Sequence, residues 1–348
     1  MSLLSRLFGA GKDDDGAPPD PRMPQLVARV LDMHSRLRLA PRCEARLAAA
    51  MAPALAHISA LIAGVPRAHQ ATASAWSGDP YLRAYFVAAD DIPQMLGRSR
   101  RLKDFFDESP GAGTAFAVLG MAMTERRTLG VATVGDQTRS DVPQTTVGFS
   151  DHHIRLCGAD EDGLRDEITR RMIDQLAIEA LAQVAADTTL REDLEQERAL
   201  LATRLRLLER QGAGLRGVMS SRGNDDDDAA PDMGELARVR AEADENEQRL
   251  KALGPRSEVL SRQLDTLCDA FANATELLQV STVKRRLDRM NVVVENGVGD
   301  EAGSRELEFR QARVPGDPPQ LRVLALLQVA RAEVPQGVNL LDHAERLL

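Results

Sequence analysis

The apolar positions change their period several times along the chain. Between Pro24 and about Ala63 they recur every three or four residues, which predicts two helices separated at Pro41. Asp79-Pro80 combines an N-cap residue with a proline at the first helical position, so a short helix is expected to begin there. From Thr114 to Cys157 apolar and polar residues alternate, as is typical of strands. This alternation predicts four short strands, at 114–124, 128–134, 145–149 and 153–157, with turns at 125–127 and 150–152.

Two long helical patterns follow, at 161–211 and from Glu235 onward, on either side of a glycine- and aspartate-rich stretch at 212–234. The second pattern holds a heptad to Ser281 in which eleven of the fourteen a and d positions are apolar. Such a row predicts a packed seam. The residues expected to form it are Leu194, Leu201, Leu205, Leu208, Leu236, Val239, Ala243, Leu250, Leu260, Leu264, Leu267 and Phe271.

An antiparallel coiled-coil hairpin accounts for both patterns. One register places Leu201 beside Ala243 and Leu194 beside Leu250, with Arg191 against Leu253 as the mismatch. Gly254-Pro255 interrupts the second helix, and we expect a kink there because proline removes a backbone donor and disturbs the helix. Two separate amphipathic helices that pack on a globular body remain the alternative interpretation.

After Met290 the period returns to two, and strands are expected at 291–295, 305–314 and 320–332, before a terminal helix capped by Asn339. The predicted fold class is α+β: N-terminal helices and a small, mainly antiparallel sheet form a head, and the coiled-coil hairpin is inserted between strands. The expected organisation is a flexible tail at 1–22, a helical and β-meander part of the head at 23–160, the hairpin at 161–290 with an acidic disordered tip at 212–234, and the remaining strands and helix at 291–348.

Composition narrows the function classes. The chain has 44 basic and 53 acidic residues, a net charge of -9, which disfavours a polyanion partner such as nucleic acid. Of the basic residues 40 are arginine, a bias that GC-rich codon usage also produces. The three cysteines, Cys43, Cys157 and Cys268, lie far apart, so neither a disulfide framework nor a thiolate zinc site is expected, and a reducing cytoplasm fits. With no run of 18 apolar residues, no membrane-spanning segment is expected.

The first nine residues have two interpretations. Leu3, Leu4, Leu7 and Phe8 fall on one side of a helix. This start resembles the short membrane-targeting ends of some bacterial peripheral proteins, which implies peripheral contact with the inner membrane. The aspartates at 13–15 would repel an anionic lipid surface, however, so a frayed tail or a partner-docking peptide is the preferred interpretation.

Chemistry-bearing motifs are scarce in the sequence. It contains no P-loop, GxSxG, HExxH, EF-hand or kinase signature. Asp151, His152, His153, Cys157 and Asp160 form the densest cluster of metal-ligand types, but on a strand His152 would point away from His153, so a solvated turn is favoured. Two basic clusters, at 98–103 and 284–289, are small and lie beside acidic residues, and we interpret them as solvated helix faces. We therefore expect no catalytic residue, metal or cofactor.

Aromatic residues concentrate at 76–106. Trp76, Tyr81 and Tyr85 are candidates for a partner or ligand surface, and the alternative is that they anchor the core of the head.

The functional hypothesis is a non-enzymatic, cytoplasmic bacterial adaptor that binds protein partners, or a second copy of itself, through the coiled coil and the head. Two alternatives stay open. One is a sensor whose strand region binds a small ligand and signals through the helix that begins near Gly163. The other is an enzyme with a site assembled from dispersed residues.

Overall fold

A computed structural model describes residues 20–134, 137–219, 233–294, 303–314 and 319–335. The fold class is mixed helix and antiparallel sheet, 57% helical and 25% strand, which agrees with α+β. The chain divides into two compact units. The first comprises Met1–Pro53 and Asp174–Ala272, and the second comprises Ala54–Ile173 and Asn273–Leu348.

The first unit is helical. It contains α1 (Met23–Met33), the short 3-10 helix η2 (Ser35–Leu39), the start of α2 (Cys43–Ala63), most of α6 (Glu161–Met219), α7 (Met233–Ala252), η3 (Arg256–Glu258) and α8 (Val259–Ala272). Pro24 occupies the first turn of α1, where a proline costs no helical hydrogen bond. The helices predicted between Pro24 and Ala63 are confirmed, with η2 in addition before the break at Pro41.

A bidentate ion pair joins α1 to α6 within this unit. Arg29 Nε and Nη2 donate to the two carboxylate oxygens of Asp174 at 2.6 and 2.7 Å. Asp174 is only 7% exposed, so its charge depends on this partner. In the same unit, Arg46 pairs with Asp265 of α8.

The long helices end differently from the prediction. The backbone of α6 remains helical to Met219, eight residues beyond the expected end at residue 211. On the other side, α7 stops at Ala252 and α8 begins at Val259, so the Gly254-Pro255 step breaks the helix and does not merely kink it. Gly254 has φ +71°, a conformation that glycine adopts readily. The acidic run Asp225–Asp228 lies outside the described residues.

The second unit is built on one sheet. Its strands are β1 (His69–Gln70), β2 (Thr114–Val134), β3 (Gln137–Gly158), β4 (Val280–Leu287), β5 (Arg305–Val314) and β6 (Gln320–Ala330). The order is β3-β2-β6-β5-β4, all antiparallel, while β1 pairs parallel with β6. The short helices described in this unit are α3 (Pro80–Tyr85), α4 (Asp91–Arg98), α5 (Arg100–Glu108), α9 (Ala274–Leu277) and the 3-10 helix η4 (Arg331–Glu333). Asp79 caps α3, as predicted, and accepts the N–H of Tyr81 at 2.8 Å.

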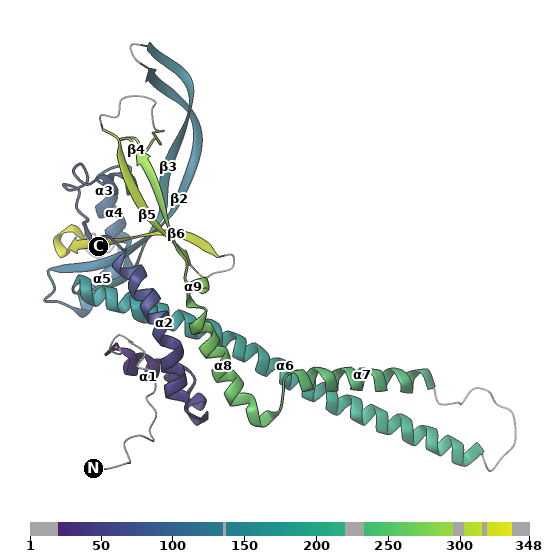
Figure 1. The fold of residues 1–348 in the computed structure, drawn as a ribbon. Helices are drawn as coiled ribbons and strands as arrows, with labels where there is room; N and C mark the ends of the chain where they lie inside the picture. Colours follow the sequence, from purple (N-terminus) through teal and green to yellow (C-terminus); the bar gives the residue numbers. More distant parts are fainter. Residues whose placement is uncertain (1–19, 135–136, 220–232, 295–302, 315–318, 336–348) are drawn as a thin grey trace, which may run out of the picture. The chain divides into compact units, whose positions relative to one another are not determined.

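The prediction of four short strands at 114–157 is wrong. The structure has two long strands, β2 and β3, which pair from Phe116 with Gly158 to Val134 with Gln137 (Figure 1). The expected turn at 125–127 lies inside β2. The expected turn at 150–152 is a bulge in β3, where the register shifts between Gly120 and Ala122 and Asp151 has φ +55°. A bulge of this kind holds a residue in the left-handed conformation, as some tight turns do, so a residue such as Asp151 is compatible with either feature.

The β2–β3 ribbon has a third strand along only part of its length. β2 pairs with β6 from Thr114 to Met121, and from Ala122 onward its described neighbour is β3 alone. The outer edge of β3 is bridged at Thr146 to Val292.

The prediction that the helical arm continues to residue 290 is also wrong. Residues 280–287 form β4, which pairs with β5 along its whole length. Ser281, assigned to a heptad d position, therefore lies in a strand. The strands predicted at 305–314 and 320–332 are confirmed as β5 and β6, whereas 291–295 contributes isolated bridges at Val292 and Val293.

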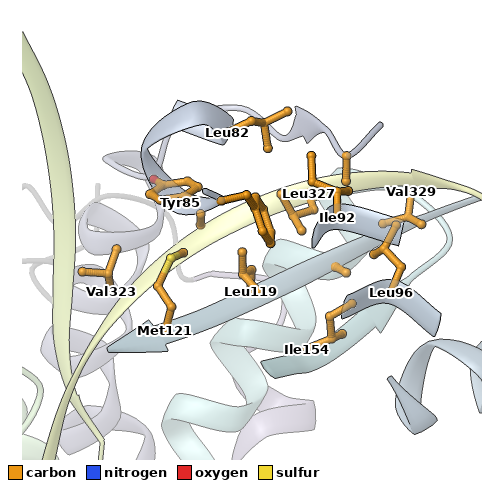
Figure 2. Close-up of a cluster of buried hydrophobic side chains, with 14 of the residues drawn as sticks. Leu82, Tyr85, Ile92, Leu96, Leu119, Met121, Ile154, Val323, Leu327 and Val329 are labelled. Carbon is orange, nitrogen blue, oxygen red and sulfur yellow. The ribbon is translucent and has the colours of Figure 1, made fainter. Parts of the chain in front are cut away.

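The sheet has apolar residues on both faces. One face packs with α3, α4 and α5, and its cluster includes Leu82, Ile92, Leu96, Leu119 and Leu327, shown in Figure 2. The other face carries a smaller cluster of Val118, Leu164 of α6 and Leu326. The helices α3 to α5 thus cover one face of the sheet, and the start of α6 lies on the other.

One described helix, α2, is long and apolar enough to cross a membrane by length and composition. A core helix of a soluble protein passes the same test, and α2 buries Leu47, Met51, Leu55 and Ile58. The predicted N-terminal tail through residue 19 and the terminal helix from Asn339 lie outside the described residues.

Candidate functional site

The predicted seam residues are all buried or half-buried. On α6, Leu194 and Leu201 are buried, and Leu205 and Leu208 are half-buried. On α7, Val239 and Leu250 are buried, and on α8 the side chains of Leu264, Leu267 and Phe271 have no exposed surface. The remaining three, Leu236, Ala243 and Leu260, are half-buried.

Polar side chains link α6 to α7 along the same stretch. Asn246, 2% exposed, donates from Nδ2 to the Leu194 carbonyl at 3.1 Å and to Glu197 at 2.7 Å. Farther along, Arg204 pairs with Glu235, close to the start of α7. Residue numbers therefore fall on α6 as they rise on α7, so the two helices run in opposite directions here.

The break after α7 is also tied to α6. Arg191 donates from Nη2 to the carbonyl oxygens of Leu253 and Gly254, the latter at 2.8 Å. The register places Arg191 beside Leu253, and these two residues do meet. The carbonyls of Leu253 and Gly254 follow the end of α7 and have no N–H from a next helical turn, so the guanidinium of Arg191 donates to them instead. The apparent mismatch of the apolar pattern is thus a helix-end contact.

α6 also displays leucines that α7 does not cover. Leu200 is 72% exposed and Leu207 is 54% exposed, and they are seven residues apart, like the buried pair Leu194 and Leu201. Since seven residues are nearly two helical turns, Leu200 and Leu207 lie on one side of α6. We call them the outer leucine pair.

The aromatic candidates Trp76, Tyr81 and Tyr85 belong to the larger core of the second unit. Tyr85 is 4% exposed, and burial holds its pKa well above the ordinary value. Trp76 Nε1 donates to the Phe86 carbonyl at 2.9 Å, and the Tyr81 hydroxyl accepts from the Glu308 N–H at 3.3 Å. These positions agree with the core interpretation and leave little of Tyr85 for a partner.

The histidine and cysteine candidates lie near each other on β3 but do not converge. His152 Nε2 donates to the Tyr85 carbonyl at 2.9 Å, and its ring stacks on Phe86 with 4.9 Å between centroids. His153 faces Asp151 at 3.0 Å. Within the described residues, no three His, Cys, Asp or Glu side chains are grouped closely enough to hold a metal ion.

Burial governs the protonation of this region. Burial lowers the pKa of His152, although its bond to Tyr85 opposes the shift. Burial also raises the pKa of the Cys157 thiol to about 11, which leaves little thiolate at neutral pH. His152 is therefore neutral at neutral pH, and Cys157 is a poor nucleophile.

Sequence reasoning did not find a pocket in the described part of the second unit. It has a volume of about 850 Å³ and lies between α4, α5 and β3. Its basic lining residues are Arg98, Arg100, Arg101, His152, His153 and Arg155. Three of these arginines belong to the cluster interpreted from sequence as a solvated helix face. The overlooked signal is Ser99, which ends α4 and caps α5 by accepting the Leu102 N–H at 3.3 Å.

The second basic cluster, at 284–289, lies on and after β4, where Lys284 pairs with Glu308 and Arg285 pairs with Glu125 at 2.7 Å. Its charge is thus partly neutralised within the sheet.

Comparison with protein-family models, with curated proteins and with solved structures gave no match.

Proposed function

We propose that this protein is a non-enzymatic interaction protein, an adaptor, in which α6 and α7 form an antiparallel coiled-coil arm that binds a protein partner or a second copy of the chain. The α+β unit acts as the head that holds a further partner. The cytoplasm is the proposed compartment, because three separated, buried or half-buried thiols suit reducing conditions.

The observation that carries this proposal is the division of leucines on α6 into two rows. Leu194 and Leu201 are buried, while Leu200 and Leu207 repeat the same spacing on the exposed surface. A single exposed leucine needs no explanation, but a pair at heptad spacing supplies one half of a further helical seam. If a partner helix covers this pair, burial of each leucine side chain stabilises the complex by about 1.5–3 kcal/mol.

The test replaces the outer leucine pair in the full chain. The double variant Leu200→Asp/Leu207→Asp is compared with Leu129→Asp, which changes a leucine of β2 that is 70% exposed. Because all three positions are exposed, circular dichroism and unfolding should resemble those of the unsubstituted protein. Affinity capture from the source cells, with mass spectrometry and light scattering, then compares the associated proteins and the molecular mass.

We expect the double variant to lose a partner, or a second copy, that the Leu129→Asp control retains. An identical set of associated proteins and an identical mass for all three chains would overturn the proposal.

A ligand-sensing regulatory protein is the second candidate. The basic pocket beside β3 favours it, since β3 leads through Gly158 into α6. The enzymatic alternative lacks a comparable observation: the histidine and the thiol nearest the pocket are engaged or protonated as described above.

A further inference from the structure

The pocket between α4, α5 and β3 has the size of a small-molecule site. Its volume of about 850 Å³ falls within the range of ligand pockets in proteins, roughly 300–1,000 Å³. The walls come from elements distant in the sequence, with α4 and α5 on one side and the bulged part of β3 on the other.

The charges around the pocket are unbalanced. Arg98, Arg100, Arg101 and Arg155 line it, and none of them makes a side-chain hydrogen bond or ion pair with the part of the chain that the structure describes. Two acids also line it, but each is engaged: Asp91 accepts the Ala88 N–H at 2.9 Å, and Asp151 pairs with Arg322 and with His153. Asp91 keeps its charge, but the four arginines outnumber the two acids, and Asp151 is already paired with Arg322, so the lining carries an excess of positive charge.

The start of α5 adds to this positive potential. Arg100 and Arg101 are the first two residues of α5, a helix of nine residues. The Ser99 hydroxyl already accepts the Leu102 N–H, whereas the N–H groups of Arg100 and Arg101 have no partner inside the helix and, together with the helix dipole, attract anions. Guanidinium groups and first-turn amides at one place form a donor set that suits the oxygens of a phosphate group.

The remaining lining indicates what the anion is attached to. Val87, which is 90% exposed, contributes apolar surface, as do Met95 and Phe149. A lone phosphate ion would leave most of the volume and this apolar surface uncovered. A long polyanion is disfavoured, because the exposed acids Asp104, Asp107 and Glu108 follow on α5.

We propose that this pocket binds a small organic phosphate. Its phosphate group lies against Arg98, Arg100 and Arg101 at the start of α5, and its apolar or planar part covers Val87, Met95 and Phe149. This inference is independent of the coiled-coil arm, because every residue it uses belongs to the second unit.

The experiment uses trinitrophenyl-ATP, a fluorescent phosphate ester with a planar aromatic group, titrated into the full-length protein. The test variant is Arg98→Ala/Arg101→Ala. The matched control, Arg126→Ala/Arg127→Ala, removes the same charge from two exposed residues of β2. Pyrophosphate and a single-stranded oligonucleotide serve as competitors, and circular dichroism verifies that both variants are folded.

We expect saturable binding to the unsubstituted protein, displacement by pyrophosphate, at least tenfold weaker binding to the test variant, and unchanged binding to the control. Absence of saturable binding would overturn the proposal, as would equal weakening in both variants. Tighter competition by the oligonucleotide than by pyrophosphate would also overturn it, in favour of a nucleic-acid site.

Discussion

Val239 offers the sharpest test of the contact between α6 and α7. It lies on α7, its side chain has no exposed surface, and it belongs to the predicted seam. Replacing it with aspartate removes an apolar side chain and places a carboxylate where the structure excludes water. Its neighbour Ala237 is exposed on the same helix, so Ala237→Asp introduces the same group with the backbone context almost unchanged.

The magnitude follows from burial. A fully buried valine contributes about 1.5–3 kcal/mol, and a carboxylate without a partner adds several kcal/mol or takes up a proton. Valine and aspartate have similar helix propensities, so propensity contributes little. Val239→Asp should therefore cost on the order of 3–5 kcal/mol at neutral pH, against about 0.7 kcal/mol for Ala237→Asp. Because most of the stability of a helix in a protein comes from tertiary packing of its apolar face, α7 should melt when this packing is lost.

The measurement is urea unfolding followed by two signals. Far-ultraviolet circular dichroism reports mainly the helices, while the fluorescence of Trp76, the single tryptophan of the chain, reports the second unit. Val239→Asp should lose helical signal at lower urea than Ala237→Asp, with less change in the Trp76 transition, and the loss should diminish at acidic pH as the carboxylate protonates. Equal helical unfolding of the two variants would refute the packing argument.

Three further outcomes are expected. Arg29→Ala leaves the buried Asp174 without its partner and should cost about 3 kcal/mol in urea unfolding, whereas Arg38→Ala, which breaks an exposed ion pair, should cost less than about 1 kcal/mol. The pKa of His152 is lowered below its ordinary value of 6.5, so its contribution to stability is present above that pH and is lost as the pH falls through the lower native pKa. The melting temperature should therefore fall less on acidification in His152→Gln than in the unsubstituted protein. Burial raises the pKa of all three cysteine thiols, so a thiol reagent should modify the native protein slowly and the unfolded chain quickly.

The helices could be predicted from the sequence because their signals are local. Pro24, Pro41 and the Asp79 cap mark helix ends through interactions within a few residues. β4 was missed because Leu278 fits the preceding heptad, and a pattern that repeats over seven heptads outweighs the β-branched residues of 280–283. Only the pairing with β5, which needs residues 305–312, decides between helix and strand there.

The pocket could not be predicted for a similar reason. Arg98 and Arg101 are charged residues in a short helical stretch, and nothing nearby in the sequence distinguishes them from a solvated surface. What distinguishes them is the bulge at Asp151, which brings the following residues of β3 opposite α4 and α5. The contact between His152 and Tyr85 spans 67 residues, and a single sequence carries no periodic signal for it.

Because β6 pairs with only part of β2, the amides at the two ends of the β2–β3 ribbon should exchange their hydrogens with solvent at different rates. Near Ala117, β2 pairs with both β3 and β6, whereas near Arg127 its sole partner among the described residues is β3. A two-stranded ribbon is marginal in water by itself. In hydrogen–deuterium exchange, the amides of β2 beyond Met121 should therefore exchange fast. Those from Thr114 to Met121, where β6 is paired as well, should exchange slowly.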